Sequence, residues 1–333
     1  MENINIESRH AFIATLMTND HIVDFYMVKK IAVKIGSNRK KYLDVTLGDK
    51  TGEITGKKWD LADEELERLS AIQPGNIAKI DAIVNEWNGM KQFRISRIRL
   101  GRKEDGTELS DFIMTAPEPA DEMFDYLMDA AEKMTDSDLR NLCMMKLEKM
   151  KPKLMYWPAA SKNHGAEMAG LLWLMKRMAM LGERACEVYT FLVSDLLIAC
   201  VIVHDLEKIN EINSNEYGIS DGYSFEGKML GHITMGVREL DKDMEELGFT
   251  DEKKVLMEHM VLSHHYEPEF GSPKRPLFAE AEMLHYLDVI DARLYDFEDA
   301  LSKTRPGEFS DRVWTLENRT VYRRKDQEKL NDD

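Results

Sequence analysis

The sequence predicts a multidomain α+β protein in which a small β-barrel precedes an all-α domain, and three observations lead to this prediction. Residues 21–100 alternate apolar and polar side chains in short runs that end in turn-forming residues, as strands do. From residue 121 onwards the apolar residues instead recur every three or four positions, which is the helical period. Residues 101–120 lie between these regions, mix Gly, Pro and charge without a period, and therefore indicate a linker.

The composition describes an ordered protein. The 333 residues are 43% hydrophobic and 32% charged, with only 9 Pro and 19 Gly, so disorder is confined to tails and linkers. A net charge of −16 argues against indiscriminate binding to nucleic acid or anionic membranes. The three cysteines form no CxxC pair, and the most apolar run, 191–203, is too short to span a bilayer. We predict a cytoplasmic protein without membrane contact; the oligomeric state stays open.

Residues 21–100 predict a closed or nearly closed barrel of the OB type. Residues 43–47 alternate apolar and polar side chains before the turn-forming segment 48–52. Asn88-Gly89 lies between two apolar runs and is a strong hairpin signal, because both central residues of such a turn favour positive φ. Short strands joined by tight turns within so few residues are typical of OB folds.

The barrel region is basic on an otherwise acidic chain. Residues 21–103 hold 17 Lys and Arg against 11 Asp and Glu, a net charge of +6, so the remainder carries −22. A positive groove with exposed rings is how such barrels hold single-stranded nucleic acid. Alternatively, the basic residues protect strand edges and the rings belong to the core. The candidate RNA-binding residues are Tyr42, Lys57, Trp59, Lys91 and Arg94, of which Tyr42 and Trp59 are in phase with polar neighbours.

Histidines cluster in the second half of the chain. Seven of the nine lie between residues 164 and 285, a segment of little more than a third of the sequence. The apolar run 191–203 leads directly into His204-Asp205, where a buried helix is expected to end. Imidazole and carboxylate together suit Mn, Fe, Ni or Zn better than Ca, and Lys208 can offer a charge to a phosphoryl oxygen. The pattern indicates a divalent-metal site; the alternative is a set of structural histidines.

The order of these residues resembles the HD-domain metal-dependent phosphohydrolases. More narrowly, the sequence is similar to the YhaM-type 3′-to-5′ exoribonucleases, which join an N-terminal OB-fold to a C-terminal HD domain. The similar segments are N-H-G-A-E-M-A-G-L-L at 163–172, H-D at 204–205, L-G-H-I at 230–233, L-S-H-H at 262–265, G-S-P-K at 271–274 and L-H-Y-L-D at 284–288. The resemblance covers nearly the whole chain.

The resemblance implies stepwise removal of nucleotides from the 3′ end of single-stranded RNA, with single-stranded DNA as a further candidate substrate. The products would be nucleoside 5′-monophosphates, and the cofactor one or two divalent ions, first of all Mn²⁺. The implied metal ligands are His204, Asp205, His232, His264 and Asp288. Asp205 and Lys208 would be catalytic, with Lys208 contacting phosphate, while His164 and His265 are candidate auxiliary or substrate-binding residues.

Other residues of this region are not expected to hold a metal. His259 and His285 are predicted to be structural, and Asp291 either orients a ligand or faces solvent. The sequence also departs from the family pattern twice: Leu174 stands where the family has a ligand histidine, and Glu207 where it has glycine. Because leucine cannot coordinate a metal, we expect weakened metal binding with retained activity.

Two other functions stay open, namely a catalytically impaired HD protein that binds RNA and an HD phosphohydrolase of a small nucleotide. The predicted organisation serves all three. It comprises an N-terminal segment (1–20), the OB barrel (21–100), a linker (101–120), connecting helices (121–160), the HD domain (161–303) and a C-terminal tail (304–333).

Overall fold

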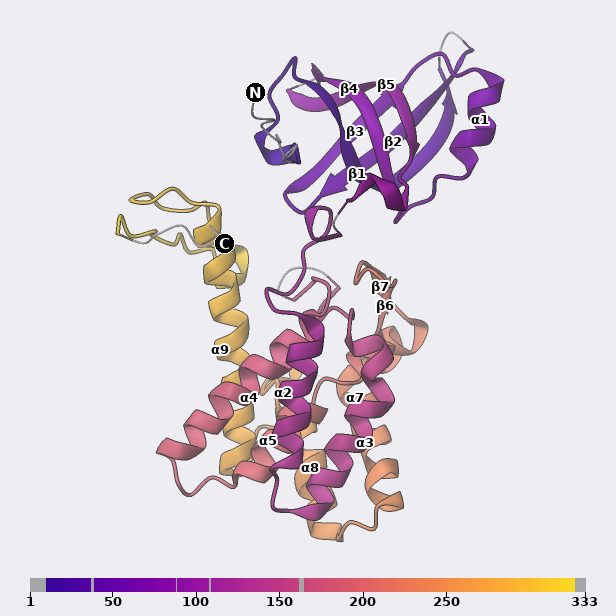
Figure 1. The fold of residues 1–333 in the computed structure, drawn as a ribbon. Coiled ribbons are helices and arrows are strands. Elements are labelled where there is room, and N and C mark those ends of the chain that lie inside the picture. The colour runs from indigo at the N-terminus through magenta and orange to yellow at the C-terminus, as the bar shows by residue number, and fades with distance from the viewer. Residues whose placement is uncertain (1–9, 37–38, 88, 108, 162–164, 327–333) are drawn as a thin grey trace, which may run out of the picture. The chain divides into compact units, whose positions relative to one another are not determined.

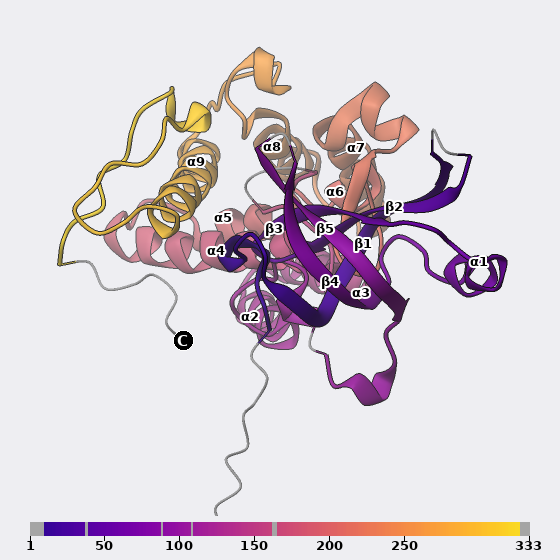
Figure 2. The same cartoon turned by 90° about the horizontal axis from the view of Figure 1, so that it is seen from above.

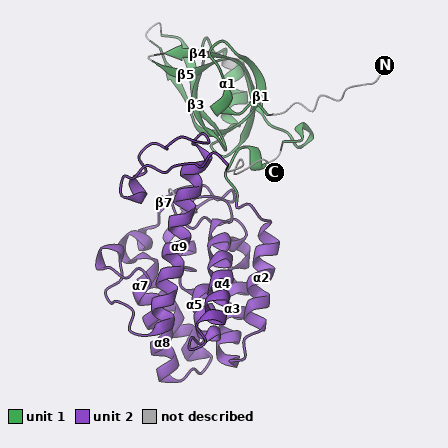
Figure 3. Ribbon diagram, turned by 90° about the vertical axis from the view of Figure 1, so that its left-hand side faces the viewer, with its two compact units in different colours: residues 1–115 green, residues 116–333 purple. Residues whose placement is uncertain are grey.

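The computed structural model describes residues 10–36, 39–87, 89–107, 109–161 and 165–326. The chain divides into two compact units, residues 1–115 and 116–333 (Figure 3). Each unit has its own hydrophobic core. The division falls within the segment that the sequence predicts as a linker.

The first unit is a closed five-stranded barrel (Figure 1). Neighbouring strands follow the order β1-β2-β3-β5-β4, and β4 pairs back with β1. All pairs are antiparallel except β3 with β5. This is an OB barrel, and the predicted fold is confirmed. The elements are β1 (His21–Ile35), β2 (Lys41–Asp49), β3 (Gly52–Lys58), α1 (Asp63–Ser70), β4 (Ile77–Trp87) and β5 (Met90–Leu100).

The alternating pattern of the strands fills the barrel. Leu43, Val45 and Leu47 of β2 are buried in the barrel core, as is Phe93 of β5, whereas Asp44 and Thr46 alternate with them and are half-buried. The predicted hairpin is also confirmed, because Trp87 lies opposite Met90. Gly89 adopts the expected positive φ of 76°, and Asn88 lies outside the described residues.

A charged cluster fastens the chain before β1 to the barrel. His10 Nδ1 lies 3.1 Å from Asp24 Oδ2, and its Nε2 lies 3.5 Å from Asp49 Oδ2. The same carboxylates accept the backbone N–H groups of Ala11 and Ile13, each at 2.6 Å. Burial by itself lowers the pKa of His10, but the two carboxylates outweigh it and raise the pKa to about 9. The imidazole is therefore charged at neutral pH.

The second unit is helical, with one small hairpin. Its helices α2 and α3, which the sequence assigns to a connecting segment, share one core with the later helices. None of the described helices has the length and apolar character needed to cross a membrane. The elements are α2 (Ala120–Glu132), α3 (Ser137–Leu154), α4 (Gly170–Val188), α5 (Ser194–Val203), α6 (Lys208–Glu211), β6 (Ile212–Ser214), β7 (Ser220–Tyr223), α7 (Phe225–Glu246), α8 (Asp251–Ser263) and α9 (Ala279–Ser302).

Helix α5 is the centre of this unit. Residues 197–203 are all buried, and α5 packs against α2, α3, α4, α8 and α9 (Figures 1 and 2). A helix that is apolar on every side can be stable only in such surroundings. Because this helix ends inside the domain, the next two residues, His204 and Asp205, also lie in the interior.

Replacing His10 by alanine is expected to destabilise the barrel by roughly 1–3 kcal/mol at pH 7, because a charged hydrogen-bonding group is lost between two carboxylates. Since the folded-state pKa is the higher one, the stabilisation is complete below pH 6.5 and is lost as the pH rises through about 9. Urea unfolding of both proteins between pH 6 and 10 measures this. The two curves should converge at high pH, and a constant difference would contradict the assignment.

His21→Ala is the matched control. His21 also lies near a carboxylate, 2.9 Å from Asp81, but its side chain is exposed. Exposed ion pairs contribute little to stability, so this variant should stay within about 0.5 kcal/mol of the wild type.

Candidate metal centre

The first two residues of the site follow the end of α5. His204 is completely buried, and its Nδ1 lies 2.9 Å from the carbonyl oxygen of Val201. That contact holds the hydrogen on Nδ1 and leaves a lone pair on Nε2. Asp205 is also buried, and its Oδ2 lies 2.6 Å from Lys208 Nζ.

A third imidazole comes from the end of α8. His264 is fully buried, and its Nδ1 lies 2.7 Å from the carbonyl oxygen of Val261. It therefore repeats the arrangement of His204, with Nε2 left to bind a ligand. From α9, His285 approaches the carbonyl oxygen of His264 with its Nδ1 at 2.8 Å. His285 thus holds the end of α8 in place, which is the structural role that the sequence predicts for it.

The fourth imidazole depends on a break in α7. Gly231 has φ 71° and ψ 158° inside this helix, a conformation that costs other residues free energy. The break lets the backbone N–H of His232 donate to Glu211 Oε1 at 3.0 Å, while its Nδ1 lies 3.0 Å from Glu211 Oε2. Glu211 is not identifiable from the sequence, because its contact with His232 depends on a helix break that the sequence pattern does not reveal.

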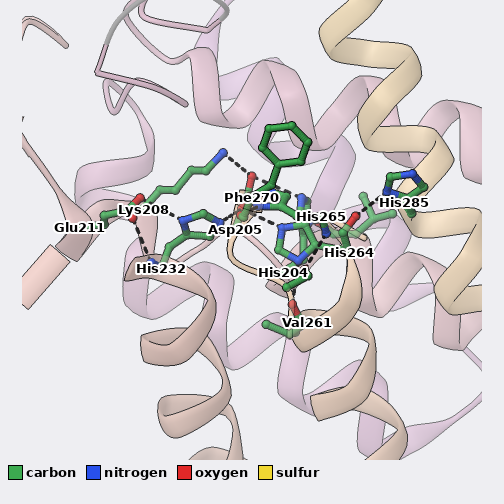
Figure 4. Close-up of polar contacts among 12 residues, drawn as sticks. His204, Asp205, Lys208, Glu211, His232, Val261, His264, His265, Phe270 and His285 are labelled. Atoms are coloured by element: carbon green, nitrogen blue, oxygen red, sulfur yellow. Dashed lines mark hydrogen bonds and ion pairs between the residues drawn. The ribbon is translucent and has the colours of Figure 1, made fainter. Parts of the chain in front are cut away.

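Asp205 is the point at which these side chains meet (Figure 4). His204 Nε2 lies 3.3 Å from Asp205 Oδ2, and the Nε2 atoms of His232 and His264 lie 3.3 and 3.7 Å from Oδ1. All three Nε2 atoms and Oδ1 are buried without a hydrogen-bond partner among the described residues. Buried polar atoms are rarely left in this state, and four that converge with free lone pairs fit a bound cation.

The donor atoms form two overlapping triads. One comprises His204, Asp205 and His264, and the other His232, His264 and His265, with the donor atoms of each triad within 4.8 Å of one another. Imidazole nitrogen with a carboxylate oxygen is a donor set for a divalent transition metal. The cluster is therefore a candidate divalent-metal site.

The charges of the site support this interpretation. Burial alone would raise the pKa of Asp205, but Lys208 and the neighbouring imidazoles hold it well below its usual value. Burial would likewise lower the pKa of Lys208, yet Asp205 and Asp288 raise it, so both charges are maintained. The pKa of His264 lies well below its usual value because of burial and the adjacent imidazoles. His264 is thus neutral, as a ligand must be.

The structure brings together four of the five residues assigned as ligands, namely His204, Asp205, His232 and His264. The fifth, Asp288, is half-buried on α9 outside both triads. Burial lowers the pKa of His204, but Asp205 and, to a lesser degree, Asp288 outweigh it and raise this pKa. His265, assigned only an auxiliary role, belongs to the second triad. His164 lies outside the described residues.

The remaining positions belong to neither triad. Leu174 is buried in the main core on α4. Glu207 is also buried, with its Oε2 accepting from Asn210 at 2.7 Å. The suggestion that Asp291 faces solvent is wrong, because it is 4% exposed and pairs with Arg177, its Oδ1 lying 2.6 Å from Nε. Burial raises the pKa of Asp291 to about 6 despite this partner.

The barrel presents most of its assigned residues on one outward face. The rings of Tyr42 and Trp59 stack with centroids 4.6 Å apart, and Lys57 Nζ lies 5.7 Å from the Trp59 ring. In the register of β3 and β5, Arg94 lies opposite Lys57, so both side chains point to the same, outward face of the barrel. We refer to Tyr42, Lys57, Trp59 and Arg94 as the aromatic face. Lys91 lies three residues earlier on β5 and donates instead to the carbonyl oxygen of Leu16.

Fold and site together define the class of the protein. The helical unit buries an adjacent His-Asp pair among further imidazoles, and residues 175–293 match the family model described as HD domain. This unit is an HD domain of the metal-dependent phosphohydrolase type, and an OB barrel precedes it.

Comparison over the whole chain narrows the class to one family. The chain is 38% identical over 302 residues to "3′-5′ exoribonuclease YhaM" of Geobacillus sp. (strain WCH70), covering 90% of this chain and 91% of the relative. It is 36% identical to the protein of the same name from Bacillus subtilis (strain 168), covering 90% and 94%. The chain belongs to the YhaM 3′-5′ exoribonuclease family. Among solved structures, the second OB-fold domain of replication protein A from Methanococcus maripaludis matches 27% of this chain and 93% of its own at 19% identity, with a TM-score of 0.22.

Glu211→Gln is expected to weaken metal binding about 10- to 100-fold, because the carboxylate that orients His232 and increases its basicity is lost. Titration calorimetry with Mn²⁺ measures the change. Glu226→Gln is the matched control. Glu226 lies on α7, the helix of His232, but its carboxylate pairs with Arg238 at the surface. Equal affinities for both variants would show that Glu211 does not support the site.

Proposed function

We propose that this protein is a metal-dependent 3′-to-5′ exoribonuclease that degrades single-stranded RNA to nucleoside 5′-monophosphates in the cytoplasm. The observation that carries the proposal is the convergence of three buried imidazoles on Asp205, beside the Lys208 ammonium. Membership of the YhaM family supports the choice of an RNA 3′ end. The three cysteines are free thiols, in keeping with a reducing compartment.

The reaction is the hydrolysis of the last phosphodiester bond. Water adds to the phosphorus of the terminal nucleotide, and the bond from phosphorus to the 3′ oxygen of the preceding nucleotide breaks. That oxygen leaves with a proton, and the released 5′-monophosphate carries the added hydroxyl. Lys208 would contact a phosphoryl oxygen, because its ammonium stays charged beside Asp205 and can stabilise negative charge that develops there.

We propose Mn²⁺ as the metal, held by His204, Asp205, His232 and His264 with His265 and Asp288 as further ligands. When bound, a divalent ion supplies an acidified water and neutralises charge on the phosphate. The protein's part is to hold each imidazole in one orientation. Val201, Val261 and Glu211 do this by engaging the nitrogen that faces away from the ligand position. Because Leu174 supplies no ligand, we expect a weaker site than a histidine there would give.

The experiment that tests the function is incubation of the full chain and Mn²⁺ with 5′-labelled single-stranded RNA. A ladder of shortening products is expected, with rates at least about 100-fold lower in Asp205→Ala because a direct ligand is lost. Asp299→Ala, which changes an exposed carboxylate of α9, should behave as wild type.

The other outcomes separate the alternatives. Intact RNA with retained binding would indicate a non-catalytic RNA-binding protein. Phosphate released from free nucleotides, without shortening of RNA, would indicate a small-nucleotide phosphohydrolase. The same assay with a DNA strand of equal sequence tests the second candidate substrate.

We further propose that the aromatic face binds the single strand. Trp59 is 49% exposed beside Tyr42, so a base can stack on this ring pair, and Lys57 and Arg94 can contact phosphates. Lys91 is a weaker proposal, since its ammonium already donates to a carbonyl group.

Trp59→Ala is expected to raise the Kd for single-stranded RNA roughly 5- to 100-fold, the usual effect of losing one stacked base. Fluorescence anisotropy of a labelled oligonucleotide measures it. The control Trp87→Ala removes a still more exposed tryptophan of the same barrel, which lies outside the aromatic face. If both variants bind alike, the aromatic face is not the binding surface.

A further inference from the structure

The segment from Tyr266 to Leu277 joins α8 to α9 and contains the G-S-P-K motif, which the metal site does not use. It begins directly after His265, a member of the second triad. Residues Pro268–Phe270 form a short 3-10 turn that ends at Gly271, whose φ of 99° favours glycine. We refer to residues 266–277 as the rim loop.

Three contacts attach the rim loop to the metal centre. The backbone N–H of His265 donates to Ser272 Oγ at 3.0 Å, and Ser272 is fully buried. His265 Nδ1 lies 2.6 Å from the carbonyl oxygen of Phe270. At Gly271, an added Cβ would stand 3.4 Å from Ile233 Cδ1, so the turn rests on α7 beside His232. The turn is therefore fixed relative to two of the imidazoles.

The ring of Phe270 is nevertheless 70% exposed. The backbone carbonyl of Phe270 is held by His265, but its side chain lacks the burial that usually stabilises a phenylalanine. In the view of Figure 4 the ring is drawn beyond the backbone that His265 contacts, on the side toward which Lys208 Nζ points. A fixed, exposed ring at the edge of a phosphate-binding site offers a surface on which a nucleobase can stack.

The chemistry of the rim loop favours stacking over recognition of a particular base. Arg275 could hydrogen-bond to a base, but its guanidinium pairs with Glu267 at 2.9 Å and lies 4.9 Å from the ring of Tyr266. Stacking tolerates every base because each has a π-face. An enzyme that removes nucleotides in succession needs this tolerance.

We propose that Phe270 binds the base of the 3′-terminal nucleotide by stacking and so positions its phosphate at Asp205 and Lys208. The inference rests on the proposed function and adds a substrate-binding residue to it. Phe270 acts on the terminal nucleotide alone, whereas the aromatic face binds the strand elsewhere.

A two-by-two comparison of protein and substrate tests the proposal. Wild type and Phe270→Ala each act on 5′-labelled RNA whose last nucleotide either carries its base or is abasic, and kcat/KM for the first cleavage is measured. Removing the base should lower kcat/KM roughly 10-fold in the wild type, and removing the ring should have the same effect. Removing both the base and the ring should lower kcat/KM no further than removing either one, because both changes abolish the same stacking contact.

Further variants separate stacking from damage to the site. Phe270→Trp keeps an aromatic ring and should restore the wild-type preference for a base. Leu277→Ala removes another highly exposed side chain of the rim loop and should change nothing. Elemental analysis should find equal Mn²⁺ in all variants, since His265 contacts the backbone of Phe270 rather than its ring.

Two results would overturn this inference but leave the proposed function standing. One is that the reductions in kcat/KM multiply when Phe270→Ala acts on the abasic RNA. The other is that Phe270→Ala and Phe270→Trp are impaired to the same degree. Failure of the wild type to shorten any RNA would instead overturn the proposed function.

Discussion

The buried negative charge of Asp205 is the constraint to which the rest of the domain conforms. A carboxylate taken out of water is costly unless cations and hydrogen-bond donors compensate it. Lys208 compensates one oxygen at 2.6 Å, and the imidazoles of His204, His232 and His264 surround the group. The helices that supply these partners end or bend at this point: α5 and α8 stop at a histidine, and α7 breaks at Gly231.

The outer nitrogens of the imidazoles show how the domain sets the orientation of its ligands. Two are held by carbonyl oxygens from their own helices, three residues earlier, so the helix end itself provides the support. The third cannot be held in this way, because its helix is broken at Gly231, and Glu211 from another element takes over. The break at Gly231 thus explains why His232, unlike His204 and His264, is oriented by a residue from another helix.

Much of the fold could be predicted because its signals are local. The alternation in β2, the Asn88-Gly89 turn and the apolar run that became α5 each act within a few residues. The histidines and Asp205 of the candidate metal site could be named because each lies in a short segment similar to the YhaM-type exoribonucleases. Residues that come into contact only through tertiary packing could not be predicted as partners. Glu211 lies 21 residues from His232 in the sequence, and Arg177 lies 114 residues from Asp291.

The burial of residues 197–203 of α5 also bears on the dynamics of the site. Backbone amides in the most enclosed helix of a domain exchange with solvent only when the whole domain opens, whereas exposed loops exchange through small local fluctuations. The floor of the site, built on α5, therefore shares the protection of the global fold, and the rim loop with its exposed phenylalanine does not. A rigid floor keeps the reactive geometry constant, while the exposed ring at the edge stays open to purines and pyrimidines in turn.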